Sequence, residues 1–170
     1  MLNVALAVNV LIVSVYFAAH NPLAVVLGVE GRTQYLSREV AGGDYPIFAF
    51  IEERLPDDSY ILFGSLGNPG FLCKRNYHAD AFFENHTLRG LLREAQDADA
   101  LLRAFEAAGY THFLFRWENV LDPEMRKSDL ELDEQQRLVE FLNVHAKLLA
   151  QMAGTHLFEI APGLGPQATQ

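Results

Sequence analysis

The residues that could do chemistry gather between Gly64 and Asp80, in the stretch "GSLGNPGFLCKRNYHAD". Gly64, Gly67 and Gly70 follow an apolar, strand-like run, and a glycine-rich loop after a strand can cradle a phosphate group. A dinucleotide-binding loop needs G-x-G-x-x-G opening directly into a helix. Here the spacing differs, an Asn-Pro turn pair interrupts the loop, and the following "FLCKRNY" looks extended. The pattern therefore favours a structural turn over a phosphate site.

Histidines and acids continue this stretch in "HADAFFENH", which offers nitrogen and oxygen atoms to a divalent ion through His78, Asp80, Glu84 and His86. The segment lacks the H-E-x-x-H spacing of a zinc helix, and no regular structure is predicted to hold it. We therefore predict no metal site, no cofactor and no catalytic residue. A candidate ligand loop remains, made of Gly64, Gly67, Gly70, Arg75, His78 and Asp80.

Charge and cysteine content exclude further classes of function. The formal net charge is −9, from 22 acidic and 13 basic residues, so a nucleic acid backbone would be repelled and we expect no nucleic acid partner. Cys73 is the single cysteine, which excludes an internal disulfide and a cysteine-based zinc cluster.

The elements that must position the loop alternate between strands and helices. Strands are predicted over Tyr60–Gly64, Tyr110–Trp117 and Thr155–Ile160. Helices are predicted from Asp44 to Pro56, from Thr87, from Asp97 to Gly109, and along an apolar stripe from Leu138 to Met152 that ends at Gly154. This order predicts an α/β fold with a small, mostly parallel sheet of about three to four strands covered by helices.

The first residues predict a transmembrane helix ahead of that fold. No Asp, Glu, Lys or Arg occurs from Met1 to Val29, and an apolar helix of this length approaches the ~30 Å thickness of the hydrocarbon layer at ~1.5 Å per residue. A secretory signal peptide, which would need a basic start, and a buried core helix are the alternatives. The predicted organisation is a transmembrane helix over 1–28, a juxtamembrane connection over 29–43, an α/β extracytoplasmic domain over 44–161 and a disordered tail over 162–170.

The order of these features resembles a known family. The segments "LGVEGRTQYLSREV", "LPDDSYILFG", "FLCKRNYHAD", "LLRAFEAAGYTHFLFRWEN" and "FLNVHAKLLAQMAGTHLFEI" look like the C-terminal part of bacterial multi-spanning C-type glycosyltransferases related to protein O-mannosyltransferases. The residues that match are Gly28, Arg32, Tyr35 and Leu36 after the last span, and Leu101, Phe105, Gly109, Thr111 and His112 in a helix–strand unit.

The resemblance implies a function for the domain. Enzymes of that family use a lipid-phosphate-linked sugar as donor and carry their acidic catalytic residues in an N-terminal membrane half. The chain would therefore be a non-catalytic accessory or recognition domain on the periplasmic side of the bacterial inner membrane. Its partners would be the lipid bilayer and the membrane core of the same or a partner protein. The alternatives are a stand-alone membrane-anchored module that binds a ligand or a protein, and a small enzyme that uses the loop from Gly64 to His86.

Overall fold

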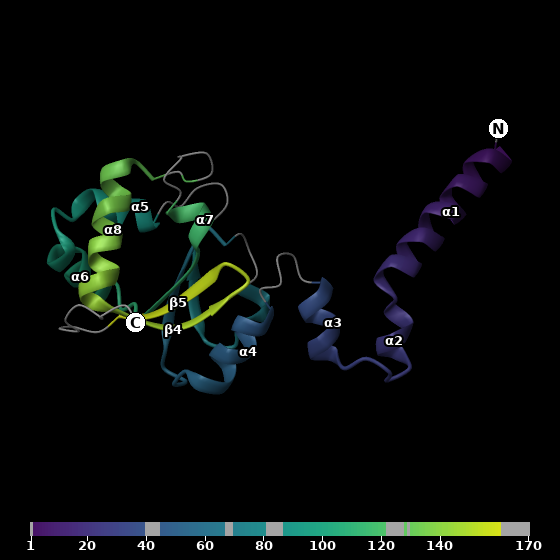
Figure 1. The fold of residues 1–170 in the computed structure, drawn as a ribbon, viewed down its shortest axis with the longest axis horizontal. Helices are drawn as coiled ribbons and strands as arrows, with labels where there is room; N and C mark the ends of the chain where they lie inside the picture. The colour runs from purple at the N-terminus through teal and green to yellow at the C-terminus, as the bar shows by residue number, and fades with distance from the viewer. Residues whose placement is uncertain are drawn as a thin grey trace. The chain divides into compact units, whose positions relative to one another are not determined.

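A computed structural model gives the fold and describes residues 2–39, 45–66, 70–80, 87–121, 128 and 130–160. The chain divides into two compact units, Met1–Tyr45 and Pro46–Gln170 (Figure 1). The predicted tail over 162–170 lies outside the described residues.

The first unit contains three helices, α1 (Leu2–His20), α2 (Pro22–Val26) and α3 (Arg32–Glu39). Asn21 has a left-handed backbone (φ 40°) and Pro22 occupies the first position of α2, so the apolar segment is divided between two helices. Among the described residues, no helix combines the length and the hydropathy needed to cross a membrane. The prediction of one transmembrane helix over 1–28 is corrected accordingly.

Polar contacts join the end of α1 to α3. Arg38 donates hydrogen bonds to the carbonyl oxygen of His20 and to the carboxylate of Glu30, both at 3.1 Å, and it pairs with Glu39. The His20 side chain also contacts Glu39, and this hydrogen bond holds the pKa of the Glu39 carboxyl below its ordinary value. Because α1 is uncharged along its length, these contacts supply the polar interactions that fix its C-terminal end.

The second unit is built on a five-stranded sheet in the order β2-β1-β3-β5-β4. The strands are β1 (Tyr60–Gly64), β2 (Asn76–Ala79), β3 (His112–Arg116), β4 (Ala146–Met152) and β5 (Thr155–Ile160). β1 pairs in parallel with β2 and β3, whereas β5 pairs antiparallel with β3 and β4. The fold is therefore mixed α/β, with five strands instead of three to four and a mixed sheet instead of a mostly parallel one.

The additional antiparallel strand comes from the segment predicted as the end of the last helix. That helix, α8 (Leu132–His145), ends at His145, and β4 begins with the next residue. Ala153 (φ 48°) and Gly154 (φ 83°) then form a left-handed two-residue turn into β5. Such turns match the twist of paired strands, so they favour a hairpin.

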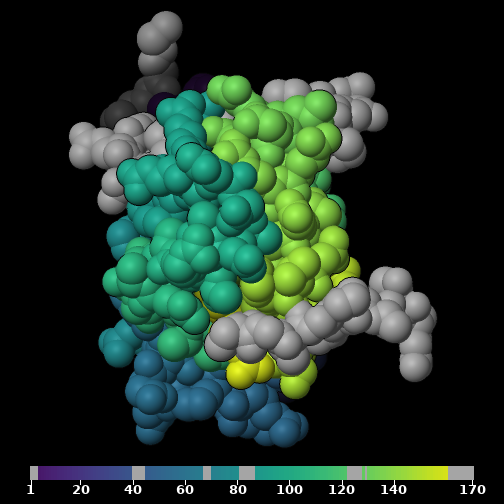
Figure 2. Space-filling view, turned by 90° about the vertical axis from the view of Figure 1, so that its left-hand side faces the viewer, coloured from purple at the N-terminus to yellow at the C-terminus, as the bar shows by residue number. Residues whose placement is uncertain are grey.

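Helices cover both faces of the sheet. Along β1, Ile61 and Phe63 pack on one face against α4 (Tyr45–Arg54), while Leu62 points to the other. The second face is covered by α5 (Thr87–Glu94), α6 (Ala98–Ala107) and α8, and Figure 2 shows these helices side by side. A short helix, α7 (Trp117–Val120), follows β3 directly.

Candidate functional site

Two glycines of the candidate ligand loop allow close packing against aromatic rings. Gly64 ends β1, and a Cβ atom there would lie 2.9 Å from a ring carbon of Phe113, which is fully buried. Gly70 begins the 3-10 helix η2 (Gly70–Leu72), and a Cβ atom there would overlap the ring of Tyr77. Gly67 lies outside the described residues. The absence of a side chain at Gly64 and Gly70 is thus explained by packing.

Arg75 binds the C-terminal end of α4. Its Nε and Nη2 atoms donate to the carbonyl oxygen of Leu55 at 3.1 and 2.9 Å, and Nη2 also donates to the carbonyl oxygen of Glu52 at 2.8 Å. These carbonyls have no partners within the helix, and a cation is favourable at a helix C-terminus. Arg75 therefore attaches the segment before β2 to α4.

Asp80 binds the N-terminal end of α5. Its two carboxylate oxygens accept hydrogen bonds from the backbone N–H groups of Thr87 at 2.6 Å and Leu88 at 3.2 Å. The backbone N–H of Asp80 donates to the carbonyl oxygen of Phe63 at 3.0 Å. Asp80 precedes α5 by seven residues and caps its N-terminal end with its side chain. It thereby joins α5 to the sheet.

His78 uses both ring nitrogens. Nδ1 lies 2.8 Å from the hydroxyl of Tyr110, and Nε2 lies 3.2 Å from the hydroxyl of Thr87. Burial raises the pKa of the Tyr110 hydroxyl, which keeps its proton available for donation. If the Tyr110 hydroxyl donates to Nδ1, Nε2 is left to donate to the Thr87 hydroxyl. His78 and Asp80 thus meet at the start of α5, whereas Arg75 lies at α4, and Glu84 and His86 fall outside the described residues.

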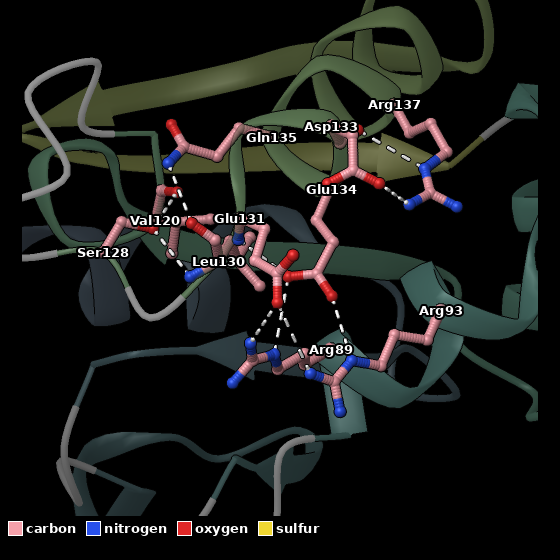
Figure 3. Close-up of polar contacts among 10 residues, drawn as sticks. All are labelled: Arg89, Arg93, Val120, Ser128, Leu130, Glu131, Asp133, Glu134, Gln135 and Arg137. Carbon is pink, nitrogen blue, oxygen red and sulfur yellow. Dashed lines mark hydrogen bonds and ion pairs between the residues drawn. The ribbon is translucent and has the colours of Figure 1, made fainter.

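A second polar cluster joins α5 to the start of α8 (Figure 3). The buried carboxylate of Glu134 lies 3.0 Å from Nε of Arg93 and 3.4 Å from Nε of Arg89, and Arg89 also reaches Glu131 at 3.3 Å. Glu134 in addition accepts the backbone N–H of Glu131 at 2.8 Å and completes a capping box. The cluster holds two helices together. Within the described residues, no group of three or more His, Cys, Asp or Glu side chains is arranged to hold a metal ion.

Cys73 is half-buried beside the loop. Its Sγ atom lies 3.6 Å from the carbonyl oxygen of Arg75, and burial raises the pKa of the thiol. A raised pKa reduces the thiolate fraction at neutral pH, so the side chain is a poor nucleophile.

An apolar groove lies between α7 and α8 and was not predicted from the sequence. It has a volume of about 570 Å³. Its apolar wall includes Trp117, Leu132, Val139 and Val144, with exposed fractions of 41%, 55%, 38% and 37%. Leu132, Val139 and Val144 lie on α8 but outside the stripe that faces the core. Apolar residues on this second face of the helix were the sequence signal that could have indicated the groove.

Trp117 also lines a second, smaller hollow. It measures about 410 Å³ and is lined by Trp117, Glu118, Gln151, Gly154 and His156. The rings of Trp117 and His156 lie 5.1 Å apart, and the backbone N–H of Trp117 donates to the carbonyl oxygen of Gly154 at 3.0 Å. Burial lowers the pKa of His156, which favours the neutral ring. The β4–β5 hairpin thereby holds the tryptophan between the two hollows.

Comparisons with known proteins give little similarity. No protein-family model matches the chain, and no curated protein matches it. Among solved structures, the chain is similar to the C-terminal globular domain of an oligosaccharyltransferase from Archaeoglobus fulgidus, with a TM-score of 0.49 and 14% sequence identity. The similarity covers 71% of this chain and 97% of that chain.

Proposed function

We propose that residues 44–161 form a non-catalytic accessory or recognition domain of a membrane glycosyltransferase-like protein that uses a lipid-phosphate-linked sugar donor. One observation carries the proposal: the polar side chains of the candidate ligand loop are engaged in bonds that hold the fold together. Arg75 binds the end of α4, Asp80 caps α5, and His78 bridges Tyr110 and Thr87. These groups act as structural ties, and the apolar groove is the larger of the two hollows described above.

The matching residues of the helix–strand unit support the same proposal, because they build the scaffold. Leu101 and Phe105 belong to α6, and their side chains are fully buried in the core. Gly109 has the left-handed backbone (φ 80°) that ends this helix, and the Thr111 hydroxyl accepts the backbone N–H of Tyr60 at 2.9 Å. Motif residues with such structural roles fit a domain whose conserved feature within the family would be its fold and not a catalytic site.

The proposal includes the partners and the location. Most described side chains of α1 are apolar and exposed, as at Val4 (68%), Val13 (65%) and Phe17 (46%). Exposed apolar surface of this extent calls for an apolar partner. We propose that residues 1–28 lie against the lipid bilayer or the membrane core of the same or a partner protein, with the domain on the periplasmic side of the bacterial inner membrane.

The experiment that tests the proposal is purification of the tagged full chain from its own cells after cross-linking. A multi-spanning membrane protein is expected in the cross-linked product, and sugar transfer from a lipid-linked donor is expected in the complex but not in the isolated chain. An open reading frame upstream of Met1 that encodes further apolar spans and an early acidic loop would support the same conclusion. A stop codon and a ribosome-binding site at Met1, with no membrane protein in the product, would contradict it.

The two alternative functions predict different results. A stand-alone binding module would cross-link to a ligand or protein outside the membrane core. An enzyme that uses the loop from Gly64 to His86 would bind a nucleotide sugar or a divalent cation in calorimetry, and an Arg75→Ala/Asp80→Asn double variant would abolish that heat.

A further inference from the structure

The groove between α7 and α8 follows one side of a helix, and this sets its shape. On α8 the lining residues fall on successive turns, from Leu132 through Gln136, Val139 and Glu140 to Asn143 and Val144. At ~1.5 Å per residue this stripe is roughly 18 Å long. Trp117 and Leu121 form the facing wall. The groove is therefore long enough for about three turns of a second helix.

The groove has a mainly apolar wall, although α8 carries polar side chains beside it. Trp117, Leu132, Val139 and Val144 are each more than a third exposed, and Leu121 below them is buried. Contiguous exposed apolar surface on a domain with a complete core marks an interaction site. The amide side chains of Gln136 and Asn143 stand exposed along its rim.

Along its longer wall the groove offers side chains. That wall is α8, and in the middle of this 14-residue helix the backbone N–H and C=O groups bond within the helix. An extended peptide would lose water from its own backbone without gaining hydrogen bonds here, whereas a helix satisfies its backbone internally. The geometry thus fits a helical occupant.

Charge decides which helix would fit. Glu140 is the one ionisable side chain among the described residues that line the groove. Glu140 follows Val139 in the sequence, and both residues line the groove. A cation opposite it would be attracted, and an acidic group would be repelled.

We propose that the α7–α8 groove binds an amphipathic helix of a partner protein, with apolar side chains at positions i, i+4 and i+7 and a lysine or arginine against Glu140. Trp117 is the central contact. Its backbone N–H is held by Gly154 at 3.0 Å and its ring lies 5.1 Å from that of His156, so the indole is already in place before binding. Rigid, half-exposed tryptophans are frequent centres of binding energy.

The test uses the fluorescence of the full chain, because Trp117 is its only tryptophan. The probe is a synthetic 18-residue alanine-based helix without tryptophan, with leucines at i, i+4 and i+7 and one lysine beside them. Two control peptides have glutamate in place of the lysine, or the same residues with the leucines dispersed around the helix. A saturable blue shift of Trp117 emission is expected with the lysine peptide, and weaker or no shift with the controls.

Variants assign the binding to the groove. Glu140→Gln should weaken binding of the lysine peptide about two- to fivefold, and Glu140→Lys should reverse the preference toward the glutamate peptide. Val139→Asp should weaken binding at least about tenfold, because it places a charge in the apolar wall. Leu148→Asp is the matched control, since Leu148 is 43% exposed on β4 and lies outside the groove. Circular dichroism verifies folding, and if Val139→Asp does not fold, the charge reversal at Glu140 decides.

Other outcomes overturn the proposal. Equal shifts with all three peptides, or no effect of Glu140→Lys, would remove the charge argument and the proposal with it. A blue shift that grows with protein concentration alone would assign the groove to a second copy of the chain. A shift produced by phosphatidylcholine vesicles without peptide would assign it to lipid.

Discussion

Asp80 illustrates how a side chain that suggests chemistry can serve the fold instead. A carboxylate near an imidazole is a reasonable candidate for ligand binding, and the sequence places Asp80 close to His78. In the folded chain the carboxylate receives two backbone N–H groups at the start of α5, and His78 is turned toward Tyr110 and Thr87. Both side chains thus contribute to the junction between β2 and α5.

Replacement of Asp80 by alanine should destabilise the domain by about 1–2 kcal/mol, because two amides at the start of α5 lose their acceptor. Asp80→Asn should cost less, since the amide oxygen still accepts one hydrogen bond. Asp58→Ala is the control, because Asp58 lies exposed in the turn before β1. Thermal unfolding followed by circular dichroism measures the three variants. An Asp80→Ala variant as stable as the control would refute the capping role.

Gly64 and Gly90 should respond in opposite directions to alanine. Gly64→Ala should destabilise by about 1–3 kcal/mol, since the new methyl group meets the fully buried ring of Phe113. Gly90→Ala should stabilise by about 0.5–1 kcal/mol, because Gly90 is in α5 and a Cβ atom there meets nothing within 4 Å. Urea unfolding measures both changes, and a stable Gly64→Ala variant would show that the core can yield at this point.

Part of this candidate site was predictable from the sequence. The wrong spacing of the glycines indicated that the loop departs from a phosphate-binding loop, and this stays a prediction. The reason for Gly64 was not predictable, because Phe113 is distant along the chain and meets it only through the pairing of β1 with β3. The groove at Trp117 was missed for the same reason, since its two walls come from separate segments.

Among the elements, α8 has two apolar faces with different roles. Leu138, Phe141 and Leu142 are buried in the core, while Val139 and Val144 stand on the groove. Its N-terminal end is fixed to α5 by the Glu134 cluster. The helix is therefore packed on one side and fixed at one end, and its other side lines the groove.

The cluster between α5 and α8 should depend on its buried member. Glu134→Ala should destabilise by about 1–3 kcal/mol, because it removes the capping box and leaves the partly buried Arg89 with only the exposed Glu131 as an ion-pair partner. Arg93→Ala should cost less than about 1 kcal/mol, since the Arg93 side chain is 57% exposed. Chemical denaturation of both single variants and the double variant gives the coupling energy, and equal costs at the two positions would contradict this ranking.

The end of α8 shows where sequence patterns fail. Leu148, Leu149 and Met152 fit a helical stripe, and they were predicted to extend the helix to Met152. They form β4 because the left-handed turn at Ala153 and Gly154 returns the chain antiparallel to β5. Strong pairing with β5 outweighed the local preference for helix, and the position of Ala153 in this turn was not a recognisable signal.

Two buried histidines on neighbouring strands should make the domain acid-sensitive. Burial lowers the pKa of His112 on β3 and of His156 on β5. The unfolded chain binds protons below the ordinary histidine value of about 6.5, while the folded chain resists them. The contribution of these two histidines to the free energy of unfolding is therefore fully present above about pH 6.5. It is lost as the pH falls from there through the lowered pKa values of the folded chain. The melting temperature should fall between pH 7.5 and 5.5, and less steeply in a His112→Gln/His156→Gln variant. An identical slope in the variant would exclude these two residues as the cause.

The whole molecule consists of two units with different surfaces. The first, residues 1–45, presents apolar side chains on α1 and α2, and the second, residues 46–170, contains both hydrophobic cores around the sheet. The alternation of strands and helices was enough to predict an α/β domain. The antiparallel half of the sheet was not predictable, because it depends on one hairpin.

The second unit should fold alone. A fragment of residues 46–170 is expected to unfold cooperatively with a melting temperature within a few degrees of the full chain, because both cores lie inside it. It should also lose affinity for lipid vesicles in flotation relative to the full chain. A fragment without a cooperative transition would show that residues 1–45 contribute to its core.

The turn at Ala153 and Gly154 has a consequence for how the domain can vary in length. Surface turns between strands ordinarily tolerate insertions and are convenient places for tags. This turn is different, because the carbonyl oxygen of Gly154 receives the backbone N–H of Trp117. An added residue would displace that acceptor and alter both hollows beside the indole. Related sequences that keep the groove should therefore keep the length of this turn, even where its residues differ.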